Sequence, residues 1–98
     1  MTADSISILY KETSKRPYKV TDRLRHTRKG IVAKSLKDLK KKSIEKLGYD
    51  PRMDVYLVLE EDGTEVDDEE YFQSLPENTT LMLLHHQDIW AAEGPPYM

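Results

Sequence analysis

An apolar run that leads directly into a tight acidic turn constrains the fold of this chain more than any other feature. The run VYLVL occupies Val55–Leu59 and is typical of a buried strand, which we expect over Val55–Glu60. The turn contains Asp62 and Gly63, and glycine accepts the positive φ angles that a tight turn requires. A short strand is expected around Val66. The stretch therefore predicts two strands joined by an acidic turn.

A single amphipathic helix is predicted over Ser35–Leu47. Ser35 is a typical N-cap residue, and Asp38 three positions later is a shorter form of the capping-box acid. Gly48 suits the C-terminal end of the helix, and Pro51 follows it. The apolar residues of this segment share one stripe at about 100° per residue. They should therefore be buried against a sheet, and they are Leu36, Leu39, Ile44 and Leu47.

The remaining segments complete an order that is typical of one fold. Candidate strands cover Tyr18–Thr21, Ile31–Lys34 and Thr80–His85, and the first two should form a hairpin. The segment Tyr71–Leu75 suggests a helical turn. One amphipathic helix against one mixed sheet is an α+β layer arrangement. The predicted fold is a ubiquitin-like roll, with one helix packed on a mixed sheet of four to five strands.

Length and composition indicate one folded domain with two less ordered ends. A chain of 98 residues is expected to form a single domain over 16–90, preceded by a weakly ordered segment over 1–15 and followed by a linker or terminal segment over 91–98. The absence of cysteine excludes disulfides and thiolate sites, and it fits an intracellular protein of the cytoplasm, the nucleus or both. No apolar run approaches the roughly 20 residues that span a bilayer, and no secretory signal is expected.

Positive and negative charges are segregated along the chain. All fifteen lysine and arginine residues lie between Lys11 and Arg52, and residues 1–52 carry only six acids, a net charge of +9. Residues 53–98 carry twelve acids and no lysine or arginine, a net charge of −12. Both halves also carry hydrophobic periodicity, so neither half is a tail. An uncompensated acidic surface attracts a basic partner, which makes a contact between charged surfaces the leading hypothesis.

Three stretches of the sequence are specific enough to compare with known families. They are RPYKVTD at Arg16–Asp22, RKGIVAKS at Arg28–Ser35 and LVLEEDGTEVDDEEYFQSLPENTTLMLL at Leu57–Leu84. In this order they resemble the CIDE-N domain, the N-terminal module shared by caspase-activated DNase, its inhibitor and the CIDE cell-death and lipid-droplet proteins. The resemblance extends from about Arg16 to Trp90, and a protein related to the DNA-fragmentation factors is the favoured member. It implies a ubiquitin-like roll with no catalysis within the module.

The resemblance also implies head-to-tail assembly with other copies of the chain or with other CIDE-N domains, including nuclease or inhibitor relatives. A basic face near the first hairpin would meet an acidic face on the next molecule and build a higher-order homo-oligomer. Carried over by position, the basic face comprises Lys19, Arg23, Arg25, Arg28, Lys29 and Lys34. The acidic face comprises Glu60, Glu61, Asp62, Glu65, Asp67, Asp68 and Glu69. The lysine-rich helix, with Lys37 and Lys40–Lys42, departs from the family pattern and leaves the edge of the basic face open.

The favoured function is an interaction module of the regulators of apoptotic DNA fragmentation. A Phox-and-Bem-like signalling scaffold is one alternative, because such domains also pair a basic patch with an acidic loop. A non-catalytic N-terminal domain of a nuclease or of a lipid-droplet CIDE protein is another. Specific nucleic-acid binding is not expected, because the basic stretch lacks interleaved aromatic residues and the acidic half repels phosphate.

No catalytic residue, metal or cofactor is predicted. The turn at Glu60–Gly63 lacks the ligand spacing of a calcium-binding EF-hand. His85 and His86 are adjacent on a predicted strand, so their side chains should point to opposite faces and cannot bind one metal ion together. The carboxylates have no neighbouring nucleophile, which argues against paired-acid catalysis. We therefore expect a non-enzymatic module.

Overall fold

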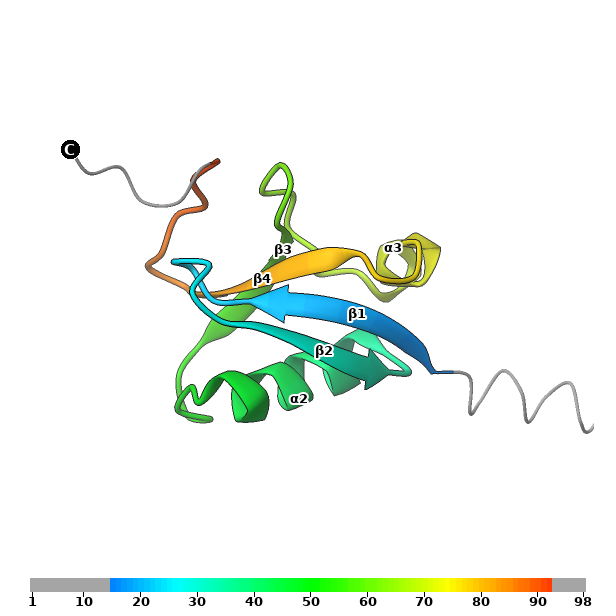
Figure 1. Cartoon of the computed structure of the whole chain (residues 1–98), viewed down its shortest axis with the longest axis horizontal. Helices are drawn as coiled ribbons and strands as arrows, with labels where there is room; N and C mark the ends of the chain where they lie inside the picture. Colours follow the sequence, from blue (N-terminus) through cyan, green and yellow to red (C-terminus); the bar gives the residue numbers. More distant parts are fainter. Residues whose placement is uncertain (1–14, 93–98) are drawn as a thin grey trace, which may run out of the picture.

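The computed structural model describes residues 15–92 of the chain (Figure 1). The predictions for segments 1–15 and 91–98 lie almost entirely outside these residues. The helices and strands, in chain order, are β1 (Arg16–Thr21), β2 (Arg28–Ala33), α2 (Leu36–Leu47), β3 (Val55–Leu59), α3 (Glu69–Ser74) and β4 (Thr80–His85).

The four strands form one mixed sheet with the order β2-β1-β4-β3. β1 pairs with β2, and β3 with β4, in antiparallel fashion, whereas β1 and β4 run parallel in the centre of the sheet. Helix α2 lies across one face of the sheet, and α3 lies near the end at which β1 begins (Figure 1). The predicted α+β class, with a helix packed on a mixed sheet, is confirmed.

The caps predicted for the long helix are present at both ends of α2. The Ser35 side-chain oxygen accepts a hydrogen bond from the Asp38 backbone N–H at 3.0 Å and so satisfies one of the helix's unpaired donors. Gly48 follows the last helical residue in the left-handed conformation, with φ of 78°. Its backbone N–H donates to the Glu45 carbonyl at 3.3 Å, which closes the final turn.

The chain after β3 differs from the prediction in two ways. The short strand expected around Val66 is only an isolated bridge between Val58 and Glu65, because the backbone then turns to bury the Val66 side chain in the core. The expected helical turn is a six-residue helix, α3, so the described residues hold two helices rather than one. Asp68 begins this helix, since its carboxylate accepts a hydrogen bond from the Tyr71 N–H at 2.8 Å.

The hairpin loop is shorter than the sequence suggested. β2 begins at Arg28, so Arg28 and Lys29 lie on a regular strand instead of in the loop between the two strands predicted for the hairpin. Asp22 closes the loop by accepting hydrogen bonds from the backbone N–H groups of His26 at 2.8 Å and Thr27 at 3.1 Å. The ladder between the two strands therefore extends further than the alternation of apolar residues indicated.

The core between α2 and the sheet is organised around Leu39, which is fully buried. Ser43, one turn later, is also fully buried, and its hydroxyl donates to the Leu39 carbonyl at 2.7 Å. Leu36, Ile44 and Leu47 are only half-buried and pack against the rim of this core. The prediction of four buried apolar residues is therefore wrong in part, because α2 approaches the sheet with a small side chain at its centre.

A second cluster covers the opposite face of the sheet and fixes the start of the acidic turn. Its fully or almost fully buried members are Val58, Met82 and Leu84. Trp90 packs over them, and its indole N–H donates to the Glu60 carbonyl at 3.0 Å. Gly63 lies directly beneath the Trp90 ring, where an added Cβ would come within 2.7 Å of ring carbon, and its φ is 80°. Glycine is therefore required at the turn for both space and conformation.

Candidate interaction faces

Three members of the basic face project from the β1–β2 hairpin on regular strands. Lys19, Arg28 and Lys29 are exposed, and none forms an ion pair within residues 15–92. Lys19 lies opposite Gly30, and Lys29 lies opposite Val20. Because side chains alternate along a strand, Lys19 and Arg28 share the face away from α2, whereas Lys29 lies on the α2 side. The positive charges of the hairpin thus lie on both faces of the sheet.

Two other members of the basic face are held within the chain. The Arg25 guanidinium lies 2.7 Å from the Glu60 carboxylate, and it also donates to the Ala91 carbonyl at 2.9 Å. Only 16% of the Arg25 side chain is exposed, and its backbone adopts a positive φ of 59°. Arg23 lies 3.9 Å from Asp88. The pair of Arg25 with Glu60 joins one member of each predicted face inside a single molecule, so the two faces are not fully separate.

Lys34, the last member of the basic face, is exposed just after β2. Its backbone N–H donates to the Asp38 carboxylate at 3.1 Å, and the Lys42 ammonium group lies 3.2 Å from the same carboxylate. The hydrogen bond from Lys34, followed by the contact with Lys42, lowers the pKa of Asp38 below its usual value. Asp38 therefore remains ionised and neutralises part of the positive charge at this end of α2.

Four members of the acidic face bind groups within the chain. Asp62 accepts a hydrogen bond from the Thr64 N–H at 3.0 Å, and this bond lowers the pKa of Asp62. Asp68 is the N-cap of α3. The Glu69 carboxylate accepts a hydrogen bond from the Leu36 N–H at 2.9 Å, at the start of α2, where the helix dipole favours a negative charge. Together with Glu60, these acids stabilise the backbone that presents the acidic face.

The other three acids of the acidic face are exposed and have no ion-pair partner among the described residues. They are Glu61, Glu65 and Asp67. Glu65 bridges to Val58 on the side of β3 that faces away from β4, and Asp67 follows two residues later. β3 is the edge of the sheet opposite to β2. The unpaired acids therefore lie across the sheet from the unpaired bases of the hairpin.

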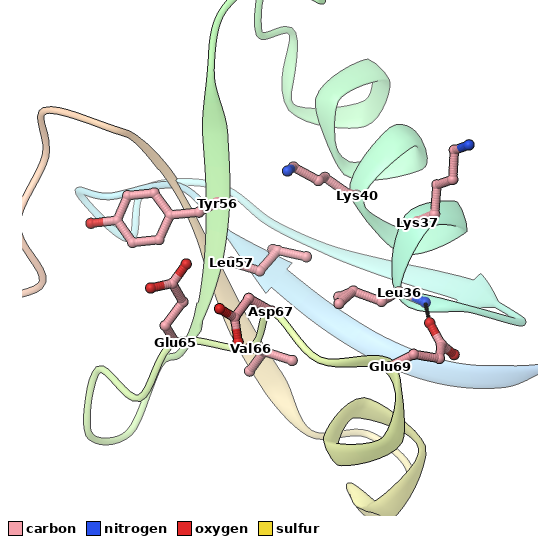
Figure 2. Close-up of a pocket in the computed structure, with 9 residues that line it drawn as sticks. All are labelled: Leu36, Lys37, Lys40, Tyr56, Leu57, Glu65, Val66, Asp67 and Glu69. Carbon is pink, nitrogen blue, oxygen red and sulfur yellow. Dashed lines mark hydrogen bonds between the residues drawn. The ribbon is translucent and has the colours of Figure 1, made fainter.

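A hollow of about 360 Å³ separates α2 from the β3–α3 connection (Figure 2). Apolar side chains lie at its centre, and charged side chains of both signs surround them. The lining residues are Leu36, Lys37, Lys40, Tyr56, Leu57, Glu65, Val66, Asp67 and Glu69. The acidic face is thus bordered by two lysines of α2, which the sequence-based assignment did not place there. A signal was present in the sequence, because Lys37 and Lys40 are three residues apart and so share one side of a helix.

The adjacent histidines His85 and His86 lie in different surroundings. Within residues 15–92, no group of three His, Asp or Glu side chains could hold a metal ion, and no helix is long and apolar enough to cross a membrane. The His85 ring packs against the Tyr49 ring, with 5.0 Å between centroids, whereas the neighbouring His86 is exposed.

The sequence is similar to those of several known proteins. The family model for the CIDE-N domain matches residues 15–91. The lipid transferase CIDEC of Bos taurus is 49% identical over 77 residues, which make up 76% of this chain and 33% of that protein. The lipid transferase CIDEA of Mus musculus is 44% identical over 75 residues, or 76% of this chain and 34% of that protein. The chain thus spans about a third of the length of these curated relatives.

Solved structures agree with the sequence comparison. The crystal structure of the DREP2 CIDE domain is 41% identical and has a TM-score of 0.77, with 80% of this chain and 98% of that chain covered. The NMR structure of the heterodimeric complex between the CAD domains of CAD and ICAD is 36% identical, with a TM-score of 0.69 and coverage of 78% and 77%. The resemblance seen in the sequence motifs is confirmed by both kinds of match. The chain belongs to the CIDE-N family.

Proposed function

We propose that this chain is a protein–protein interaction module that joins copies of itself, or other CIDE-N domains, head to tail through its basic and acidic faces. The sheet order β2-β1-β4-β3 carries this proposal, because β2 and β3 form opposite edges. Arg28 and Lys29 lie on β2, whereas Glu65 lies beside β3. One small body thus offers a positive edge and a negative edge, and each can meet the other edge of a neighbour.

Such a contact is heterologous, so it closes into a ring or continues as an open helical filament. Individual exposed ion pairs contribute only about 0.2–1 kcal/mol each, so several must act together. Salt should weaken the contact, because the Debye length falls from about 10 Å at 0.1 M to about 3 Å at 1 M. The complex between the CAD domains of CAD and ICAD supports the choice of partner, since two different domains of this family pair in it.

The branch of the family is the finer part of the proposal. A role among regulators of apoptotic DNA fragmentation is supported by the 36% identity to the CAD domains, whereas the lipid transferases CIDEC and CIDEA are matched at 49% and 44%. DNA fragmentation or lipid transfer would be an activity of a whole protein. In that protein, this chain supplies the contact through which copies assemble inside the cell. Titration with the isolated domains of ICAD and of CIDEC would show which branch supplies the tighter partner.

Light scattering at two salt concentrations tests the assembly. We expect multimers at about 0.05 M salt and a return to the monomer mass at about 1 M, because the longer Debye length allows the two edges to attract. A control variant with Glu45→Lys and Glu77→Lys changes two exposed acids outside the acidic face and should still assemble. A monomer at both salt concentrations, or a multimer that is insensitive to salt, would rule out charge pairing as the basis of assembly.

A further inference from the structure

The hollow between α2 and the β3–α3 connection brings both signs of charge to the acidic face. Lys37 and Lys40 line it from α2, and the carboxylates of Glu65 and Asp67 line it from the connection. Its apolar side chains come from Leu36, Leu57 and Val66. A basic side chain of a partner that approaches the acidic face at this point must therefore also approach the lysines of α2.

Lys40 differs from the other lysines of α2. In Figure 2 its side chain extends from the helix across the hollow toward β3, whereas the end of Lys37 points away from the hollow. Lys42 is held at 3.2 Å by Asp38, on a different side of the helix. Lys41 is exposed and lines only a second hollow beside Tyr49, which Lys37 and Lys40 also line. Of the two lysines that line this hollow, Lys40 is therefore the one whose side chain extends across the space between α2 and the β3–α3 connection.

Lys40 lines the same hollow as Glu65 and Asp67 without forming an ion pair with either of them. Among the described residues, no nitrogen–oxygen distance of 4.0 Å or less joins Lys40 to Glu65 or Asp67. An ammonium group that shares a hollow with two carboxylates weakens the negative potential that a basic partner would meet. Its flexible four-carbon stem also lets it compete with an incoming cation for the same carboxylates.

We propose that Lys40 is a built-in competitor at the acidic face and sets how tightly that face holds a basic side chain of a partner. The proposal rests on the proposed function, because the competing side chain belongs to the basic face of a neighbour. In the bound state the methylene groups of that side chain lie against the apolar residues of the hollow, and its charged end meets Glu65 and Asp67. Lys40 makes this contact weaker at low salt and less dependent on salt.

A pair of matched variants tests the proposal. Lys40→Gln and Lys41→Gln remove the same charge from the same helix, and lysine and glutamine have similar helix propensities. Each dilute protein is titrated at low salt with a blocked peptide of four arginines, and NMR follows the amides of Glu65 and Asp67. We expect Lys40→Gln to bind the peptide about two- to fivefold tighter than the original chain, whereas Lys41→Gln changes the affinity less than about 1.5-fold.

A second measurement follows self-assembly of the same variants by light scattering. Lys40→Gln should assemble at a concentration about two- to fivefold lower than the original chain, and this difference should disappear at high salt. If the peptide measurement gives the expected result but no form of the chain assembles, the proposed function fails while the role of Lys40 stands. Unfolding midpoints show whether both variants are equally folded.

Three results would overturn the role of Lys40. An equal gain in peptide affinity for both variants would mean that only the net charge matters. A loss of affinity in Lys40→Gln would mean that Lys40 contacts the ligand favourably. No binding of the peptide near Glu65 and Asp67 in any variant would mean that the hollow does not receive basic side chains.

Discussion

The β1–β2 hairpin and the β3–α3 connection carry opposite charges, and they differ in how the chain uses those charges. On the hairpin, Lys19 and Arg28 lie on regular strands whose backbone groups pair with each other. In the connection, the backbone is irregular, and Asp62 and Asp68 accept hydrogen bonds from backbone N–H groups, as does Glu69 at the start of α3. Lys19 and Arg28 are thus left for a partner, whereas these three acids satisfy backbone groups.

In the hairpin loop, as in the acidic connection, a charged side chain binds groups within the chain. Arg25 lies in that loop, and its guanidinium binds the Glu60 carboxylate and the Ala91 carbonyl. Both signs of charge therefore include side chains that bind groups within the chain and side chains that remain for assembly. On this basis Glu65 and Asp67 are the acids to change in tests of assembly, and Arg28 and Lys29 are the bases.

The largest expected effect comes from the core on which both regions depend. Leu39→Ala should lower the free energy of unfolding by about 2–5 kcal/mol, because it leaves a cavity at the fully buried centre of α2. Urea unfolding measures this loss, and Lys41→Ala on the exposed side of the same helix should change stability by less than about 0.5 kcal/mol. Equal stabilities of the two variants would mean that the hairpin and the connection are held by something other than this core.

Within the hairpin, Arg25 is bound inside the chain and Arg28 is available to a partner, so changing each one should have a different effect. Arg25→Ala should lower the free energy of unfolding by about 1–3 kcal/mol, because it leaves the Glu60 carboxylate without its partner in a partly buried position. Arg28→Ala should change stability by less than about 0.5 kcal/mol but weaken assembly. Denaturant unfolding and light scattering on both variants separate the two effects. A stable Arg25→Ala protein would show that the loop arginine is not structural.

Asp68 and Asp67 make the same distinction in the connection. Asp68→Ala removes the N-cap of α3 and should cost about 0.5–2 kcal/mol. Asp67→Ala, one residue earlier, should leave stability nearly unchanged and reduce assembly at low salt. Thermal or urea unfolding of the two variants gives the comparison. The distinction between structural and available acids would be lost if both variants were equally destabilised.

A smaller effect is expected from pH. The hydrogen bond from Lys34 and the contact with Lys42 lower the pKa of Asp38 in the folded chain. Such a group stabilises the fold above its unfolded pKa of about 3.9, and this contribution is lost as the pH falls through the folded pKa. The free energy of unfolding should therefore decrease below about pH 4, and Asp38→Asn should make that decrease smaller. An unchanged slope in Asp38→Asn, measured by urea unfolding across this range, would contradict a structural role for the carboxylate.

Local signals explain how much of the fold could be predicted. Ser35 and Gly48 cap α2 through neighbours in sequence, and the last strand, Thr80–His85, was predicted with the bounds that the structure has. The buried Ser43 was missed because a hydrophobic stripe does not show how closely a helix approaches the sheet. The six-residue helix α3 was predicted only as a turn, because the capping role of Asp68 is hidden within a run of acids.

The site could be predicted only as far as charge and chain order allow. The segregation of charge along the sequence indicated two charged regions. The sheet order places Arg28 and Lys29 at one edge and Glu65 at the other. The ion pair between Arg25 and Glu60 joins residues 35 positions apart, so no local pattern reveals it. The position of Lys40 beside the acids likewise depends on how α2 packs against the connection after β3. These long-range contacts decide which charges remain available.

Mixing two variants, each altered at one edge, is the most direct test of head-to-tail charge pairing. The first variant carries Glu65→Lys and Asp67→Lys and keeps its basic edge. The second carries Arg28→Glu and Lys29→Glu and keeps its acidic edge. Each variant alone should stay monomeric at low salt, because one of the two surfaces that every contact needs has been reversed.

Light scattering then measures the molecular mass of the species in the equimolar mixture at low salt. We predict a one-to-one heterodimer that does not grow further, because only the unaltered edge of each variant can pair and the reversed edges end the chain. This dimer should dissociate at high salt. Large species formed by either variant alone, or a mixture that stays monomeric at concentrations where the original chain assembles, would contradict assembly through opposite edges of the sheet.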